Sequence, residues 1–302
     1  MSIVDETSIS SHARVTRRPM RDGRPAANAR QVSADFDIRK HIFGFASNVA
    51  GASNVIMQLS WPGVGYGVKE STVDSGNALK HPVKRGRTTF TYLAVALLGT
   101  DEDRAHFRRA VNKQHVQVRS TDASPVEYSA MDPELQLWVA ACLYYGTVDI
   151  SERMFGPMDD QSADDLYAYC ARFGTSLQVR DGMWPADRDA FAAYWQEGVA
   201  KAHIDEPIRQ YLDSLSRLEN LPAVFRRRYA EKSMFWTRGF LPPEFRAQMG
   251  YSWSEDEEAE LNRRMRRLGR VQRLLPTPVR IFPFNLLLWD MRRRYRKGIA
   301  LV

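Results

Sequence analysis

The sequence predicts an all-α protein, and two observations support this prediction. Apolar residues recur at the spacing of a helix face, for example at Leu135, Trp138, Val139 and Cys142. Capping signals precede several such segments. Long alternating strand patterns are absent from the sequence, so the expected architecture is one multi-helix domain.

The N-terminal part of the chain is expected to differ from the rest. Residues 1–34 are polar, basic and aperiodic, which predicts a disordered arm. Residues 1–20 contain no apolar core of the kind that a secretory signal needs. Residues 35–302 contain no internal repeat and no low-complexity linker, so they predict a single helical domain.

The stretch 61–84 is rich in glycine and predicts a long loop, a kind of segment that is often functional. Its run Gly63–Gly67 lacks the lysine of a Walker motif, and we interpret it as a flexible turn. Apolar spacing then predicts helices over residues 84–98 and about 101–119.

Capping residues and glycines predict where the helices begin and end. The predicted starts combine a cap with an acidic residue or a proline in the first turn, at Thr100–Asp103, Asp132–Glu134, Ser162–Asp165 and Ser254–Glu257. The predicted C-termini are glycines that follow apolar runs, at Gly99, Gly146 and Gly174. Two more apolar stripes, at Leu166–Phe173 and Tyr211–Leu218, predict further helices packed on the core.

Composition narrows the class of protein. Hydrophobic residues make up 44% and charged residues 26% of the 302 residues, as in a soluble globular protein. The two cysteines form no CxxC motif, which argues against a zinc ribbon, a thioredoxin-type site and a covalently attached haem. Such sparse cysteine usage fits a reducing compartment, so a cytoplasmic location is expected. No apolar run reaches the 18 residues that indicate a membrane-spanning helix.

Positive charge is concentrated in arginine clusters, and the formal net charge is +7. The favoured interpretation is a solvated helix surface. Nucleic-acid binding is disfavoured because the clusters lack interleaved aromatic residues and a reading motif. The stretch 274–297 joins an apolar segment to a basic one. It predicts a last helix docked on the core, with peripheral membrane contact as the alternative.

One histidine has the position of a candidate ligand. On the helix predicted after Thr100, His115 falls on the apolar face, whereas His106 falls on the opposite face and is expected to point toward water. Spacing alone favours an ordinary hydrogen-bonded core histidine. The sequence has no HExxH motif and no repeated ExxH motif, which argues against a zincin and a carboxylate di-iron bundle.

Three further residues are candidates for chemistry. Arg85 and Thr89 lie four residues apart on a predicted helix and therefore share a face. An arginine in a pocket can hold a carboxylate bidentately. Glu70 lies in the predicted loop, and a carboxylate in a dry pocket can act as a base. Spacing alone favours a surface arginine, a back-bonded threonine and an ordinary loop carboxylate.

An ordered series of short motifs resembles the MpaB-type oxygenase family, known as DUF2236, which also contains the latex clearing proteins. The resemblance extends over roughly residues 40–295, and its specificity comes from the order and combination of the motifs. The motifs are Pro62–Val68, Arg85–Thr89 with Tyr92–Leu93, Gly99, Val111–Val118, Tyr128–Leu135, Trp138–Val139, Trp184–Pro185, Phe191–Trp195, Leu275–Pro276, Arg280, Pro283 and Asp290–Arg293.

The resemblance implies a globin-like helical fold around haem b. It implies that His115 is the proximal iron ligand and that Arg85 and Thr89 line the distal pocket. It also implies an upstream glutamate acting as a base, for which Glu70 is the nearest candidate. The expected activity is that of an oxygenase using O₂ on a lipophilic, alkene or isoprenoid-like substrate. The alternative is a non-enzymatic helical protein that binds a lipid.

Overall fold

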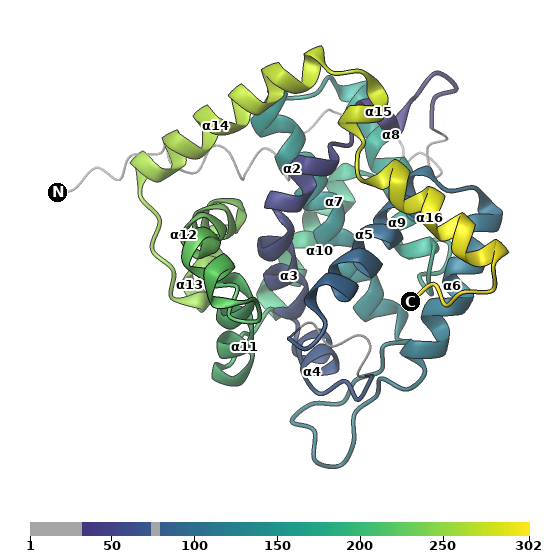
Figure 1. Cartoon of the computed structure of the whole chain (residues 1–302), viewed down its shortest axis with the longest axis vertical. Helices are drawn as coiled ribbons and strands as arrows, with labels where there is room; N and C mark the ends of the chain where they lie inside the picture. Colours follow the sequence, from purple (N-terminus) through teal and green to yellow (C-terminus); the bar gives the residue numbers. More distant parts are fainter. Residues whose placement is uncertain (1–31, 74–78) are drawn as a thin grey trace.

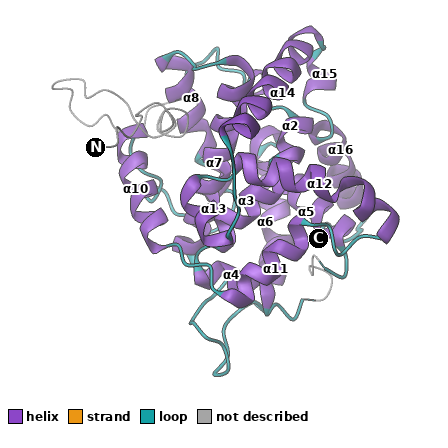
Figure 2. Ribbon diagram, turned by 90° about the vertical axis from the view of Figure 1, so that its left-hand side faces the viewer, coloured by secondary structure: helices purple, strands orange, loops and turns teal. Residues whose placement is uncertain are grey.

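The computed structural model describes residues 32–73 and 79–302, and the named secondary-structure elements within these ranges are all helices. The only strand-like pairing in the described residues is a single bridge between Arg119 and Ser129. The predicted all-α class is therefore confirmed (Figure 2). Most of the predicted N-terminal arm, residues 1–31, lies outside the described residues. Ser33 is already attached to the body, since its backbone N–H donates to the carboxylate of Asp165 at 2.9 Å.

Figure 1 shows how the helices are arranged, with α3, α5 and α7 in the middle of the molecule and α14 running across its top. The described helices, in chain order, are η2 (Ile38–Lys40), α2 (Gly44–Val49), α3 (Gly51–Leu59), α4 (Pro62–Lys69), α5 (Pro82–Leu98), α6 (Asp101–His115), α7 (Pro133–Phe155), α8 (Asp160–Cys170), α9 (Arg172–Thr175), α10 (Arg188–Lys201), α11 (Glu206–Ser216), α12 (Ala223–Phe240), α13 (Pro243–Met249), α14 (Glu255–Leu274), α15 (Thr277–Arg280) and α16 (Phe284–Arg296).

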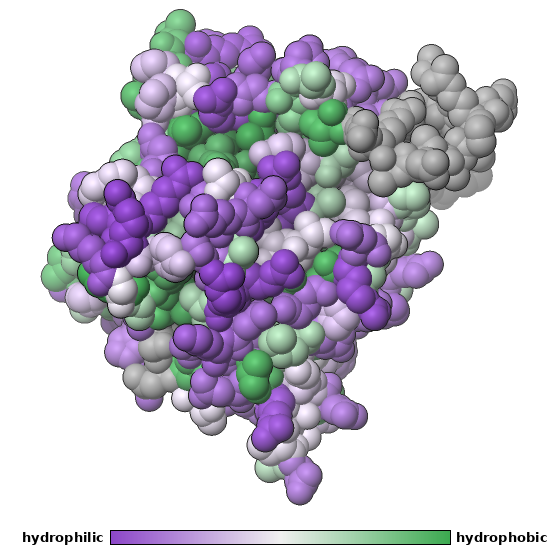
Figure 3. All heavy atoms as spheres, turned by 90° about the vertical axis from the view of Figure 1, so that its right-hand side faces the viewer, coloured by the Kyte–Doolittle hydropathy of each residue, from purple (hydrophilic) through white to green (hydrophobic). Residues whose placement is uncertain are grey.

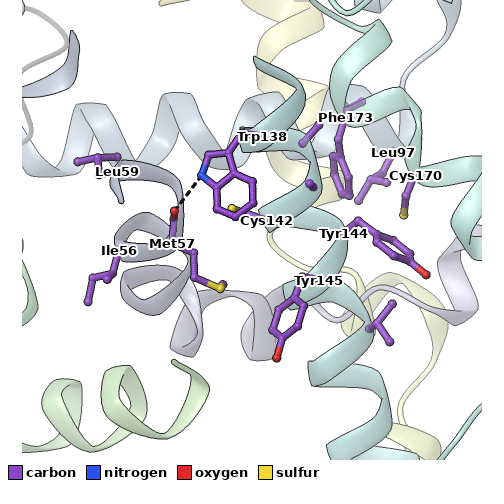
Figure 4. Packing of buried hydrophobic residues seen from close by; sticks show 14 of the residues in the cluster. Ile56, Met57, Leu59, Leu97, Trp138, Cys142, Tyr144, Tyr145, Cys170 and Phe173 are labelled. Atoms are coloured by element: carbon purple, nitrogen blue, oxygen red, sulfur yellow. Dashed lines mark hydrogen bonds between the residues drawn. The ribbon is translucent and has the colours of Figure 1, made fainter. Parts of the chain in front are cut away.

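The core is built around α7, whose side chains are buried on nearly every face of the helix. Trp138 is completely buried and stacks between Trp61, at a ring-centroid distance of 4.9 Å, and Trp195, at 5.2 Å. Its indole N–H donates to the backbone oxygen of Met57 at 3.1 Å, so this polar atom is satisfied inside the core (Figure 4). Burial on most faces explains why much of α7 has a hydrophobic rather than an amphipathic sequence.

The prediction of one long loop over residues 61–84 is wrong for its first part, which forms helix α4. Pro62 occupies the first turn, where its missing N–H costs nothing. The glycines are there for close packing. A Cβ on Gly65 would lie 2.6 Å from the backbone oxygen of Leu59, and one on Gly67 would lie 3.3 Å from the ring of Tyr128. The glycine-rich run is therefore a tightly packed helix and no flexible turn.

The predicted starts of α6, α7 and α14 are confirmed. Thr100 and Ser254 each form a reciprocal capping box with the acidic residue three positions later, and Asp132 caps α7. The start predicted at Ser162 is wrong. Helix α8 begins at Asp160, because the carboxylate of Asp159 accepts the N–H of Ser162 at 2.8 Å and so acts as the cap.

Only one of the three predicted glycine C-termini is correct. Gly99 follows the last residue of α5, as expected. Helix α7 continues through Gly146 to end before Gly156, which has a φ of 85°. Gly146 leaves room for Asn54, whose amide donates to the Cys142 carbonyl. Gly174 lies inside α9, where a Cβ would meet Val179 at 2.8 Å, so it serves packing too.

The last helix docks on the body, as predicted. Helix α16 packs along α5. The rings of Phe284 and Phe90 lie against each other, with 6.2 Å between their centroids. Arg292 donates to Asp103 at 2.6 Å, which joins α16 to the capping box of α6. Figure 3 shows the molecule from the side on which α16 lies in Figure 1. In the described part of the chain, no helix is both long enough and apolar enough to cross a membrane.

Candidate active site

A cavity of about 600 Å³ lies between helices α3, α5, α6, α7 and α11. This volume is within the range of about 300–1,000 Å³ that is typical of small-molecule sites. Its wall is mainly apolar, with a small number of polar side chains facing the interior. These include three of the predicted site residues, His115, Arg85 and Thr89. The fold thus brings together residues that are 26 to 30 positions apart in the chain.

His115 is the last residue of α6 and lies on the cavity wall with Val111 and Val118. The predicted direction of its side chain, toward the interior, is confirmed. The helix is shorter than predicted, because the chain turns at Val116 instead of continuing to about residue 119.

The prediction for His106 is wrong. Its side chain is only 13% exposed, and its ring stacks on Tyr295 of α16 at 3.7 Å between centroids. Docking of the last helix covers this face of α6, which the sequence of α6 alone could not reveal. His106 and His115 nevertheless lie on different faces, and only His115 lines the cavity.

The imidazole of His115 is held in its neutral form. Burial, together with the positive charge of Arg85, lowers its pKa to about 4. Its Nδ1 atom is buried and has no hydrogen-bond partner among the described residues. A buried polar group usually has a partner. This unpartnered ring nitrogen beside the cavity is therefore available to a metal or a polar group that enters the cavity.

Arg85 and Thr89 lie one turn apart on α5 and both line the cavity. The Arg85 side chain keeps accessible surface, yet burial lowers the pKa of its guanidinium. A cation at this place, close enough to depress the pKa of His115, can bind an anionic group of a ligand.

Tyr211 is a cavity residue that was assigned from the sequence to an apolar stripe of the core. It extends from α11, and its hydroxyl is near enough to Arg85 for the guanidinium to oppose the rise in its pKa that burial causes. Its neighbour Leu212 is buried, which agrees with the stripe. The packing of α11 on α3 and α4 places Tyr211 at the cavity, and the sequence gives no signal for that packing.

Glu70 is not among the residues that line the cavity. It ends α4, and its Oε2 atom accepts hydrogen bonds from Ser124 at 2.7 Å and from Tyr128 at 2.8 Å. These bonds fasten the segment between α6 and α7, which projects at the bottom of Figure 1, to the end of α4. The structure therefore places this carboxylate apart from Arg85, Thr89 and His115.

The donor set suits a metal that needs one protein ligand. Among the residues that the structure describes, no group of three or more His, Cys, Asp or Glu side chains could hold a metal ion. A haem iron takes four ligands from the porphyrin and needs only an axial one from the protein, often a histidine. His41 also lines the cavity, and burial lowers its pKa as well, but of the two imidazoles it is His115 whose pKa the positive charge of Arg85 also lowers. The neutral imidazole of His115, the nearby guanidinium and the mainly apolar wall therefore fit a haem better than they fit a bare ion.

Comparison with known proteins shows the family to which the chain is similar. Residues 39–274 match the family model described as "ER-bound oxygenase mpaB/B'/Rubber oxygenase, catalytic domain". The chain is also 51% identical over 251 residues to two uncharacterized proteins, one of Mycobacterium bovis and one of Mycobacterium tuberculosis. Each alignment covers 83% of this chain and 98% of the relative. No solved structure matches the chain.

Proposed function

Because this chain belongs to the mpaB and rubber oxygenase catalytic-domain family, we propose that it is a haem b-dependent oxygenase that uses O₂. The proposed substrate is a lipophilic molecule with an alkene or isoprenoid-like group, held in the cavity. One observation carries the haem assignment: the buried imidazole of His115 is neutral, has no partner on Nδ1 and lies on the cavity wall.

His115 would hold the haem through its iron, and Arg85 would pair with a carboxylate of the porphyrin or with a polar group beside it. A neutral imidazole has the lone pair that iron binding needs, and a pKa of about 4 keeps it available throughout the physiological range. When bound, the haem supplies an iron that can activate O₂.

The other cavity residues act on what enters the site. Thr89 could donate a hydrogen bond from its hydroxyl, and Arg85 could donate hydrogen bonds that orient a polar group entering the cavity. Apolar walls from α3, α5 and α7 exclude water and fit a lipophilic substrate. Glu70 was predicted to be the base. Because Ser124 and Tyr128 donate to it and it does not line the cavity, the structure favours a different role, in which Glu70 positions the segment between α6 and α7.

An absorption spectrum of the purified protein tests the haem assignment. We expect a Soret band, present as isolated or after addition of haem b. His115→Ala should abolish or displace the band, because it removes the axial ligand. His106→Ala is the matched control, since His106 lies on the same helix and does not line the cavity. A protein that takes up no haem, or a band unchanged in His115→Ala, would contradict the proposal.

Glu70→Gln separates the two roles of the carboxylate. If Glu70 abstracts a proton from the substrate, the variant binds haem normally and loses turnover by at least about 100-fold. If it only holds Ser124 and Tyr128, the amide oxygen can still accept their hydrogen bonds, and turnover falls much less.

The largely apolar cavity wall also favours a second candidate function, that of a non-enzymatic carrier of a lipid. A protein that is isolated free of haem, with a lipid bound in stoichiometric amount, would support this candidate. Mass spectrometry of an organic extract, compared with the visible spectrum of the same sample, decides between the two functions.

A further inference from the structure

The structure carries an exposed apolar surface outside the cavity, which we call the α14–α16 patch. Leu274 is 86% exposed and Trp289 is 55% exposed, although both are large apolar residues. Such side chains are usually scattered singly, and a group of them marks an interaction site. The patch consists of Phe45, Val271, Leu274, Val279, Phe282, Leu286 and Trp289.

Backbone contacts hold the members of the patch together. A Cβ on Gly44 would lie 2.1 Å from the backbone oxygen of Phe282, so α2 touches the segment before α16 and brings Phe45 close to Phe282. Leu286 and Trp289 lie one turn apart on the outer face of α16, while Leu288 points inward. Hydrophobic side chains gather in the upper part of Figure 3, at the height that α15 and the start of α16 have in Figure 1.

Positive charge surrounds the patch. Residues 261–302 contain twelve arginines and lysines and a single acidic residue, Asp290. Arg293 pairs with Asp290 at 2.9 Å and lies over the ring of Trp289 at 5.7 Å. Arg273 lies next to the exposed Leu274. Apolar side chains bordered by arginines match a bilayer that carries anionic headgroups, and tryptophan is typical of the level where headgroups meet acyl chains.

Two segments of the chain connect the patch to the cavity wall. Phe43 and Phe284 line the cavity, and each is two residues from a member of the patch, Phe45 and Phe282. We propose that the α14–α16 patch is a peripheral membrane-binding surface that seats the protein on anionic bilayers and directs the cavity toward the lipid phase. The supply of substrate from the membrane rests on the proposed function, whereas the membrane contact does not.

A second copy of the chain fits the patch less well. A two-fold dimer would place the patch against itself and bring the arginines of α14 and α16 together. Arg263 and Arg264 pair with Glu260, and Arg292 pairs with Asp103. Residues 261–302 nevertheless contain twelve basic residues and one acidic residue, so like charges at close range still oppose association. Anionic lipid neutralises the same charges.

Co-sedimentation of the full chain with vesicles tests the proposal. We expect binding to phosphatidylcholine vesicles that contain phosphatidylglycerol, weaker binding to phosphatidylcholine alone, and a decrease with salt. Replacing Phe282, Leu286 and Trp289 by serine should weaken binding at least about tenfold, because three large apolar groups no longer leave water. In the matched control, Val224 and Phe225 of α12, which are also exposed, are replaced by serine. This variant should bind the vesicles like the unchanged chain.

Equal binding by the triple variant and the unchanged chain overturns the proposal. So does a patch-dependent dimer seen by sedimentation velocity in the absence of lipid. Trp289→Phe gives a second test that leaves the fold intact. Brominated lipids should quench the tryptophan fluorescence of the unchanged chain more than that of this variant, and equal quenching also overturns the proposal. These readouts need neither haem nor turnover, so they can fail or succeed independently of the oxygenase assignment.

Discussion

At the scale of single residues, the site depends on how one imidazole is surrounded. The sequence placed His115 on the interior face of its helix, and spacing alone suggested a hydrogen-bonded core residue. The structure gives Nδ1 no partner among the described residues and puts a guanidinium nearby. Both features depend on neighbours from other helices, and helical periodicity carries no information about those neighbours.

This environment makes a prediction about pH. The pKa of His115 is about 4 in the folded protein, against an ordinary value of 6.5. A group whose pKa is lower in the folded state favours folding while it is neutral, so its contribution is complete above pH 6.5 and is lost as the pH falls toward 4. Between pH 7 and pH 4, we expect the haem-free protein to lose up to about 3 kcal/mol of unfolding free energy through this residue.

Urea unfolding of the haem-free protein at pH 7, 5.5 and 4.5 measures the effect. His115→Phe is the comparison, because a phenyl ring fills similar space and does not titrate. As the pH falls, the unfolding free energy of the unchanged protein should decrease relative to that of His115→Phe. Parallel pH profiles would show that His115 is well solvated and is not held neutral by burial.

At the scale of elements, capping residues were the most informative part of the sequence and glycines the least. The caps at Thr100, Asp132 and Ser254 act locally, so local sequence was enough to predict them. Gly65 was predicted to lie in a flexible turn and Gly146 to end a helix, because a glycine that admits a close neighbour looks the same in sequence as one that turns the chain or ends a helix. What distinguishes them is a contact with a residue from elsewhere in the fold.

Two glycine substitutions test this interpretation of α4. Gly65→Ala should lower the unfolding free energy by about 1–3 kcal/mol, because the new Cβ would overlap the backbone oxygen of Leu59 and press on Ile208. Gly86→Ala on α5 is the matched control. Its Cβ would meet nothing within 4 Å, so helix propensity should raise stability by about 0.5–1 kcal/mol. Thermal or urea unfolding measures both, and equal effects would contradict the packing role of Gly65.

At the scale of the whole molecule, the sequence predicts the all-α class, but it predicts only some of the residues that line the cavity. Periodicity predicts the class because each helix is amphipathic or buried by itself. The cavity needs α3, α5, α6, α7 and α11 in their final positions, so Tyr211 was missed, and Glu70, the candidate base, is not among the lining residues. The motif resemblance supplied part of this long-range information, since it joined Arg85, Thr89 and His115 in one site.

Helix α7 contributes to the cavity wall and α14 carries part of the α14–α16 patch, so the contact between these two helices sets the position of the patch relative to the cavity. Arg153 of α7 is only 4% exposed at its side chain. It donates to Asp149 on its own helix at 2.9 Å and to Glu258 and Asn262 on α14 at 2.7 and 2.8 Å. A buried cation with partners on both helices holds α7 and α14 in one register. Without it, the carboxylate of Asp149 would stay buried and lose the cation that it pairs with.

Arg153→Met should therefore lower the unfolding free energy by about 3–5 kcal/mol, although methionine fills much of the same space. Arg209→Met is the matched control, because its pair with Glu206 is exposed, with side chains 41% and 55% accessible, and exposed pairs contribute about 1 kcal/mol or less. Denaturant unfolding compares the two. If α14 is held chiefly by apolar contacts, both variants will lose similar small amounts, and the membrane-binding patch would then keep its position without the ion pair. A large loss in Arg153→Met alone, accompanied by weaker vesicle binding, would show that the buried pair sets the position of α14 and, through it, the position of the patch.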